Sequence, residues 1–157
     1  MEDNLKDGHG SSTHHNWTIS MENLLKVFLS YAPSERELAM SLASRLTREG
    51  FDVWSFDRKV RFGENYARKV GKALEKSRAM IVLISPEAVE SRSVSHEIGF
   101  AIGSLNYEHR LIPVVVRPTN DMPWVLKNME IVNVGADWDK ACEQISIILH
   151  KTVAIAE

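Results

Sequence analysis

The sequence is poor in cysteine and proline and has no long apolar run, and each scarcity excludes a class of protein. Its one cysteine, Cys142, has no partner for an internal disulfide, which fits a reducing compartment. Five prolines and eight glycines among 157 residues exclude collagen-like and low-complexity chains. No eighteen consecutive residues are apolar, so the sequence predicts no membrane-spanning helix.

Neither sign of charge is in excess. The chain has 19 lysines and arginines against 21 aspartates and glutamates, for a formal net charge of −2. Binding to a phosphate backbone needs a clear basic excess, so we expect no direct nucleic-acid partner. The polar N-terminus lacks the apolar stretch of a secretory signal, and we expect a cytoplasmic protein without membrane contact.

Residues 1–23 differ in composition from the rest of the chain. They are rich in glycine, serine and histidine and have no apolar period, so we expect a disordered or loosely attached tail followed by one domain over 24–157. His9, His14 and His15 have no cysteine or carboxylate at ligand spacing, and we expect no metal site.

The rest of the chain alternates between short apolar runs and amphipathic stretches of helical period. The run 79–84 contains no polar residue, as expected of a strand covered on both faces of a parallel sheet. The alternation predicts an α/β fold, a flavodoxin-like doubly wound five-stranded parallel sheet flanked by helices. The predicted strands are 26–31, 51–56, 79–84, 111–116 and 131–134.

Several residues predict where these elements begin and end. Ser34 and Glu37 have the spacing of a reciprocal capping box, and Gly50 follows a leucine stripe as a left-handed helix stop. Asp137 is placed to cap the last helix. Pro113 lacks an amide donor, so the fourth strand is expected to pair on one side only at that point.

Sheets of this kind bind ligands at the carboxyl ends of their strands, and several familiar sites are missing there. The sequence has no phosphate-binding loop of the nucleotide triphosphatases. A phosphoreceiver domain would need an aspartate where the third strand ends, and Ser85 stands there. Cys142 lies beside a core stripe with no base near it, and His96 and His109 have no partners for a catalytic triad.

One acidic residue, Glu97, stands out on the helix predicted from about residue 93 to 105. Glu97 lies roughly 80° from the centre of the apolar face, at the border of core and solvent. A carboxylate there, near the ligand edge of the sheet, can stabilise a developing sugar cation or hold ribose hydroxyls. The face is expected to be buried and comprises Val94, Ile98, Ala101, Ile102 and Leu105.

A second interpretation of Glu97 stays open, because acidic residues are favoured near helix N-termini by the helix dipole. If Ser93 is the N-cap, Glu97 comes one residue too late for a reciprocal capping bond. Capping therefore does not account for it.

Six segments, in this order and spacing, resemble the TIR (Toll/interleukin receptor) domain family, particularly its bacterial members. The likeness extends from residue 26 to about 150, which leaves out the tail. The segments are 27–31, 50–54 with Asp57 after it, the loop 57–63 with Tyr66, 81–86, 91–97 and 111–115.

The resemblance implies an enzyme that cleaves NAD+, in which Glu97 matches the catalytic glutamate of the third helix. Such members cleave the nicotinamide–ribose bond to give nicotinamide and ADP-ribose or a cyclic variant. The resemblance implies NAD+ as substrate with no other cofactor, and activation by self-assembly with other TIR domains or by a separate partner protein. It also implies a role in bacterial immune signalling such as antiviral defence.

The family's substrate pocket maps onto two loops of this chain. The resemblance places Ser30 and Tyr31 at the pocket, with Tyr31 and Tyr66 flanking the nicotinamide ring and Arg58 and Arg61 meeting the phosphates. Simpler roles stay open: both tyrosines suit half-buried packing, and both arginines suit solvated loop charges.

Other positions concern assembly and the shape of the pocket. The resemblance places Phe62 and Gly63 in the loop that packs one domain on another, and Phe62 has no evident core role. Trp54 is expected in the core rather than as a stacking platform. Ser93 is a departure, because many enzymatic members have a tryptophan four residues before the glutamate. A serine supplies no stacking surface, so the nicotinamide side of the pocket must differ.

Two other functions remain open from the sequence. The first is a non-catalytic TIR interaction or scaffold module, whose binding would depend on Phe62 and its loop. The second is a different glycosyl enzyme on the same sheet, such as a nucleoside deoxyribosyltransferase with Glu97 as nucleophile.

Overall fold

The computed structural model describes residues 24–55 and 65–156. This part of the chain forms a parallel sheet of five strands in the order β2-β1-β3-β4-β5, the flavodoxin-like arrangement predicted from the sequence. The strands are β1 (Lys26–Ser30), β2 (Asp52–Ser55), β3 (Ala79–Ile84), β4 (Leu111–Val115) and β5 (Val132–Asn133). The boundary between tail and domain falls next to residues outside the described part and stays a prediction.

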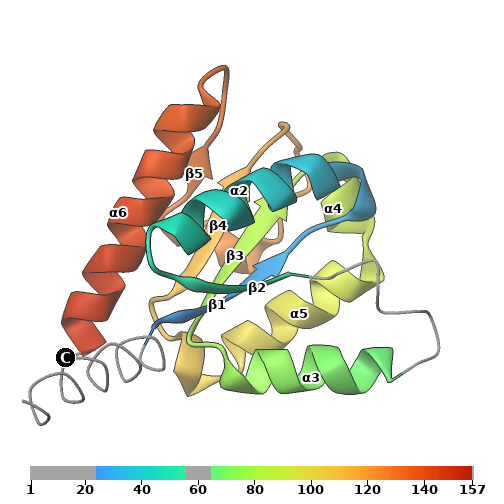
Figure 1. Ribbon diagram of the computed structural model, residues 1–157. Coiled ribbons are helices and arrows are strands. Elements are labelled where there is room, and N and C mark those ends of the chain that lie inside the picture. The colour runs from blue at the N-terminus through green and yellow to red at the C-terminus, as the bar shows by residue number, and fades with distance from the viewer. Residues whose placement is uncertain (1–23, 56–64, 157) are drawn as a thin grey trace, which may run out of the picture.

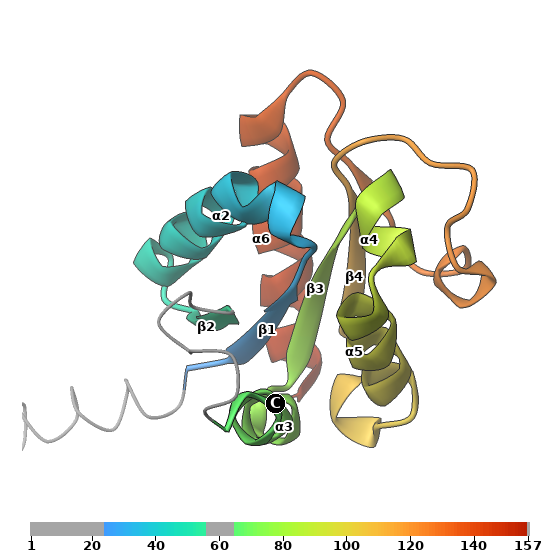
Figure 2. The same ribbon diagram turned by 90° about the vertical axis from the view of Figure 1, so that its right-hand side faces the viewer.

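Helices cover both faces of the sheet (Figures 1 and 2). In Figure 2, α2 and α6 lie on one side of the strands and α4 and α5 on the other. None of the described helices is both long and apolar enough to cross a bilayer. The helices are η2 (Pro33–Glu35), α2 (Arg36–Arg48), α3 (Tyr66–Lys76), α4 (Pro86–Glu90), α5 (Arg92–Ile102), η3 (Leu105–Tyr107), η4 (Trp124–Leu126) and α6 (Trp138–Ala156).

The core divides into two apolar clusters, one on each face of the sheet. Leu29 of β1 packs in the cluster with residues of α2 and α6, and Phe28 packs in the cluster with residues of α3 and α5. This alternation follows from the two-residue period of a strand. All six residues of β3 are buried, as the uniformly apolar run predicts.

Two of the predicted helix ends are confirmed and one is wrong. Gly50 has a φ of +98° after α2, and the Asp137 carboxylate accepts a 3.0 Å hydrogen bond from the amide of Lys140 at the start of α6. The capping box of Ser34 and Glu37 is not formed, because a 3₁₀ turn from Pro33 to Glu35 delays the α-helix until Arg36. The Ser34 hydroxyl instead donates to the Glu35 carboxylate at 2.7 Å.

The fourth strand pairs as its proline predicts. Pro113 lies opposite Val82 of β3, and the pairing with β5 begins only at Val114.

The expected burial of Ile102 and Leu105 is wrong. Ile102 is 47% exposed and Leu105 is 87% exposed. Helix α5 ends at Ile102, with Gly103 as its C-cap, so the helical period that would have buried Leu105 does not continue.

Candidate active site

Helix α5 places Glu97 beyond its first turn. Ser91 is the N-cap of this helix, and its hydroxyl accepts a 3.3 Å hydrogen bond from the amide of Val94. Glu97 follows this N-cap by six positions. The effect of the helix dipole is confined to the first turn, so it does not account for an acidic residue here.

The carboxylate of Glu97 meets the end of β1. Ser30, the last residue of that strand, is buried, and its hydroxyl donates a 2.7 Å hydrogen bond to Oε1 of Glu97. Glu97 itself is half-buried, as its position on the helix predicts. The contact lies at the carboxyl edge of the sheet, where doubly wound folds bind ligands.

The surroundings of Glu97 favour its protonated form. Burial raises the pKa of Glu97 to about 7, and the hydrogen bond from Ser30 lowers it in part. No charged side chain of the described residues contributes to this shift. Near neutral pH the group is therefore present in both its protonated and its ionised form.

The structure brings Ser30 to Glu97, and of the other predicted substrate residues it describes the side chains of Tyr31 and Ser93. Tyr31 is half-buried and packs against the cluster of α2 and α6, on the opposite face of the sheet from Glu97. Ser93 is exposed in the first turn of α5, with its hydroxyl 3.2 Å from that of Ser91. Tyr66 begins α3. Their roles toward a substrate stay predictions.

Four predicted residues lie outside the described part of the chain. These are the proposed phosphate contacts Arg58 and Arg61 and the proposed assembly residues Phe62 and Gly63. The three histidines of the tail also fall outside it. Among residues 24–55 and 65–156, no three histidine, cysteine, aspartate or glutamate side chains gather as metal ligands would.

Trp54 belongs to the packing of the sheet face that carries Ser30. Its indole stacks on the ring of Phe28, with 4.9 Å between the ring centroids and 20° between their planes. Trp54 is half-buried in the cluster of α3 and α5. This confirms a core role for the tryptophan.

Two other polar side chains are poor candidates for chemistry. Cys142 is buried in α6, and burial raises the pKa of its thiol, which disfavours the reactive thiolate. Burial raises the pKa of Tyr107 to about 12, and its hydroxyl donates a 2.6 Å hydrogen bond to the carbonyl of Leu74. Both groups are structural.

A cavity of about 720 Å³ opens at the amino-terminal edge of the sheet, away from Glu97. Its lining includes Leu111 and Ile112, which begin β4, and Ile148 of α6. The carboxylates at the cavity, Glu108 and Glu130, are both exposed. The cavity therefore lacks a half-buried acid like Glu97.

One cluster at the carboxyl edge was missed in the sequence. Arg117, just after β4, forms ion pairs with Glu35 of η2 and Glu87 of α4. The only sequence signal for it was a charged residue directly after a strand.

The family model of the TIR domain matches residues 27–146. The chain belongs to the TIR domain family. A curated relative of this TIR domain, the 2′ cyclic ADP-D-ribose synthase BtTIR of Bacteroides thetaiotaomicron, is 25% identical over 118 residues. That alignment covers 70% of this chain and 41% of the relative, so the TIR domain described here spans less than half of that protein.

Solved TIR domains have the same fold at low sequence identity. The TIR domain of the Toll-related receptor TRR-2 from Hydra magnipapillata matches with a TM-score of 0.64 at 23% identity, over 82% of this chain and 97% of that one. The TIR domains of the activated Roq1 resistosome match with a TM-score of 0.62 at 19% identity, over 80% of this chain and 99% of that one. At this level of identity, these similarities support the fold of the domain and say nothing about its activity or partners.

Proposed function

We propose that this TIR domain cleaves NAD+ at the nicotinamide–ribose bond, giving nicotinamide and ADP-ribose or a cyclic variant. The observation that carries the proposal is the half-buried Glu97, held by Ser30 at the carboxyl edge of the sheet, with its pKa raised to about 7. Perturbed carboxylates at a ligand edge are candidates for catalysis. The similarity to a bacterial cyclic ADP-ribose synthase supports the choice of substrate.

Cleavage of the nicotinamide–ribose bond needs mainly one correctly placed carboxylate. Nicotinamide is cationic in NAD+ and leaves as a neutral base with the electron pair of the broken bond, so no general acid is needed. The positive charge that develops on the ribose is stabilised by the ionised Glu97 carboxylate. Water, which loses a proton, or a nucleophile within ADP-ribose then forms the new bond to the sugar carbon.

Ser30 fixes the orientation of this carboxylate. Its hydroxyl occupies Oε1 of Glu97, which leaves Oε2 for the ribose hydroxyls or the developing charge. Such preorganisation costs nothing at the moment of reaction and is the largest contribution in many enzymes.

The proposal predicts nicotinamide release from NAD+ by the purified protein. If a partner copy completes the pocket, the rate per molecule will rise with protein concentration. The measurement is nicotinamide by chromatography over a hundredfold range of protein concentration, with the sugar product identified by mass spectrometry. No release even at the highest concentration would contradict cleavage, whereas release strictly proportional to protein would contradict activation by self-assembly alone.

The raised pKa of Glu97 predicts how the reaction depends on pH. If the ionised carboxylate is the active form, kcat/KM rises with pH around the pKa of about 7. Between pH 6 and pH 8 the ionised fraction, and with it kcat/KM, increases about tenfold. Initial rates at low NAD+ concentration across this range test it, and a flat or falling profile would show that ionised Glu97 does not limit the reaction.

A non-catalytic interaction module is the second candidate, favoured by one observation. Ser93, one turn before Glu97, is exposed and offers no ring for stacking on nicotinamide. This alternative predicts binding to other TIR domains that is unaffected by changes at Glu97, without nicotinamide release.

A further inference from the structure

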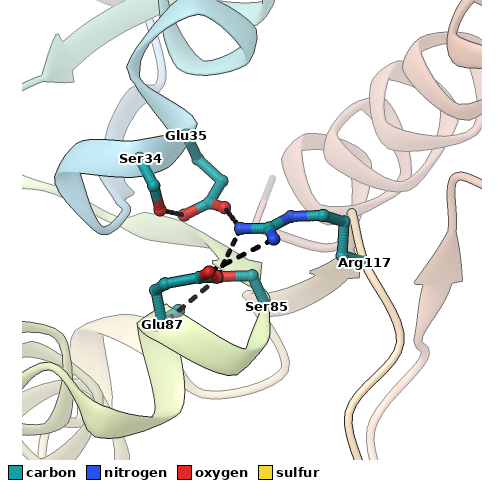
Figure 3. A network of polar contacts seen from close by, with 6 residues as sticks. Ser34, Glu35, Ser85, Glu87 and Arg117 are labelled. Atoms are coloured by element: carbon teal, nitrogen blue, oxygen red, sulfur yellow. Dashed lines mark hydrogen bonds and ion pairs between the residues drawn. The ribbon is translucent and has the colours of Figure 1, made fainter.

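The guanidinium group of Arg117 joins η2, α4 and the segment after β4 at the carboxyl edge of the sheet (Figure 3). Figure 3 shows Arg117 between the carboxylates of Glu35 and Glu87. Nη1 of Arg117 donates to Oε1 of Glu87 at 3.2 Å, and Nη2 donates to both glutamates. The backbone amide of Arg117 contacts the carbonyl of Ile84 at the end of β3, which anchors the base of this side chain to the sheet.

Glu35 depends on this arginine. Its side chain is 2% exposed, and its two carboxylate oxygens accept from Arg117 and from the Ser34 hydroxyl. A buried carboxylate is tolerated only where it is paired and hydrogen-bonded. The turn from Pro33 to Glu35 is therefore fixed to the end of β4 through Arg117.

Both arms of this network lead along the chain to the candidate active site. On one side, Glu35 follows Ser30 by five residues, through the buried Ala32. On the other side, Glu87 lies on α4, and Ser91 is both the C-cap of α4 and the N-cap of α5, which carries Glu97. Arg117 thus ties together the two segments whose ends meet in the hydrogen bond between Ser30 and Glu97.

We propose that Arg117 is a positioning residue, which holds Ser30 and Glu97 in hydrogen-bonding contact by fixing η2 through Glu35 and α4 through Glu87. The role in geometry stands by itself, and only its consequence for NAD+ cleavage rests on the proposed function. Arg117 touches neither Ser30 nor Glu97, so its influence passes through the backbone segments between them.

The pKa of Glu97 provides a readout of this positioning. Its shift is caused by burial and by Ser30, and the charge of Arg117 is not among the causes. A change in the Glu97 pKa on loosening the network therefore reports a change of position or hydration rather than a lost charge. This readout needs no substrate and stays informative if the domain cleaves no NAD+.

The decisive variant is Glu87→Gln, with Glu90→Gln as its matched control. Both glutamates are exposed on α4, but only Glu87 is paired with Arg117, and the structure records no ion pair of Glu90 with any described residue. Glu35 keeps its pairing in both variants, so both are expected to fold. The pKa of the Glu97 carboxyl is measured by carbon NMR in the full chain.

We expect Glu87→Gln to move the pKa of Glu97 by about half a unit or more, and Glu90→Gln to leave it unchanged. Loss of the hydrogen bond from Ser30 moves this pKa upward and entry of water around the carboxylate moves it downward, so a shift in either direction reports the loosened contact. Arg117→Lys keeps the charge but loses the planar guanidinium that pairs with both glutamates, so it is expected to move the pKa of Glu97 further. An unchanged Glu97 pKa in Glu87→Gln overturns the proposal. Where NAD+ is cleaved, kcat falls and KM stays.

Discussion

Replacement of Glu97 by glutamine is expected to slow nicotinamide release from NAD+ by about a hundredfold or more at saturating substrate. The loss reflects the removal of a preorganised charge from beside the developing ribosyl cation, which typically costs that much in rate. Glutamine has the shape of glutamate, and its amide oxygen still accepts the hydrogen bond from Ser30. The fold of the site is therefore kept while its charge is lost.

The matched control for this experiment is Glu108→Gln. Glu108 is an exposed carboxylate at the amino-terminal edge of the sheet, so its loss should leave turnover within about twofold of the parent. Equal turnover in the parent and in Glu97→Gln would remove Glu97 from the mechanism. A deficit of similar size in both variants would point to damaged protein instead.

The same substitution is expected to stabilise the fold at high pH. The pKa of Glu97 is about 7 in the folded protein against an ordinary value of 4.5, so the folded state binds this proton more tightly than the unfolded state. Stability from this group is therefore complete below pH 4.5 and is lost as pH rises toward 7. One pKa unit is worth about 1.4 kcal/mol, so the ionised carboxylate costs about 3 kcal/mol at pH 8.5.

Urea denaturation at two pH values checks this expectation. At pH 8.5, Glu97→Gln should raise the free energy of unfolding by about 3 kcal/mol, and at pH 4.5 the gain should be close to zero. A gain that is equal at both values would mean that charge burial is not its origin. Together, slower cleavage and a more stable fold would identify a carboxylate kept for function at the expense of stability.

The sheet was predictable from the sequence because its signals are local. A uniformly apolar run such as 79–84 is stable only where all its side chains are buried, which is the case in a central strand covered by helices on both faces. Gly50 and Asp137 also predict helix ends locally, Gly50 through its left-handed backbone and Asp137 through its capping carboxylate. The capping box at Ser34 failed because a tertiary contact, the burial of Glu35 against Arg117, competes for the same turn.

The site was predictable only in part. Periodicity placed Glu97 at the border of the core. Its contact with Ser30, however, joins residues 67 positions apart and depends on how α5 packs against the end of β1. Tyr31 follows Ser30 directly, just past the end of β1, and packs against the cluster of α2 and α6 instead of lying beside Glu97. The pairing of Arg117 with Glu35 spans 82 positions and has no local pattern at all.

The last strand, β5, is only two residues long, from Val132 to Asn133. The outer border of the sheet on that side therefore exposes too few main-chain amides and carbonyls to template a strand from another molecule. Any second copy that docks along this border must be recognised by side chains rather than by an extension of the sheet. Single substitutions can strengthen or weaken such an interface. It also does not support the open-ended addition of strands that exposed sheet edges favour.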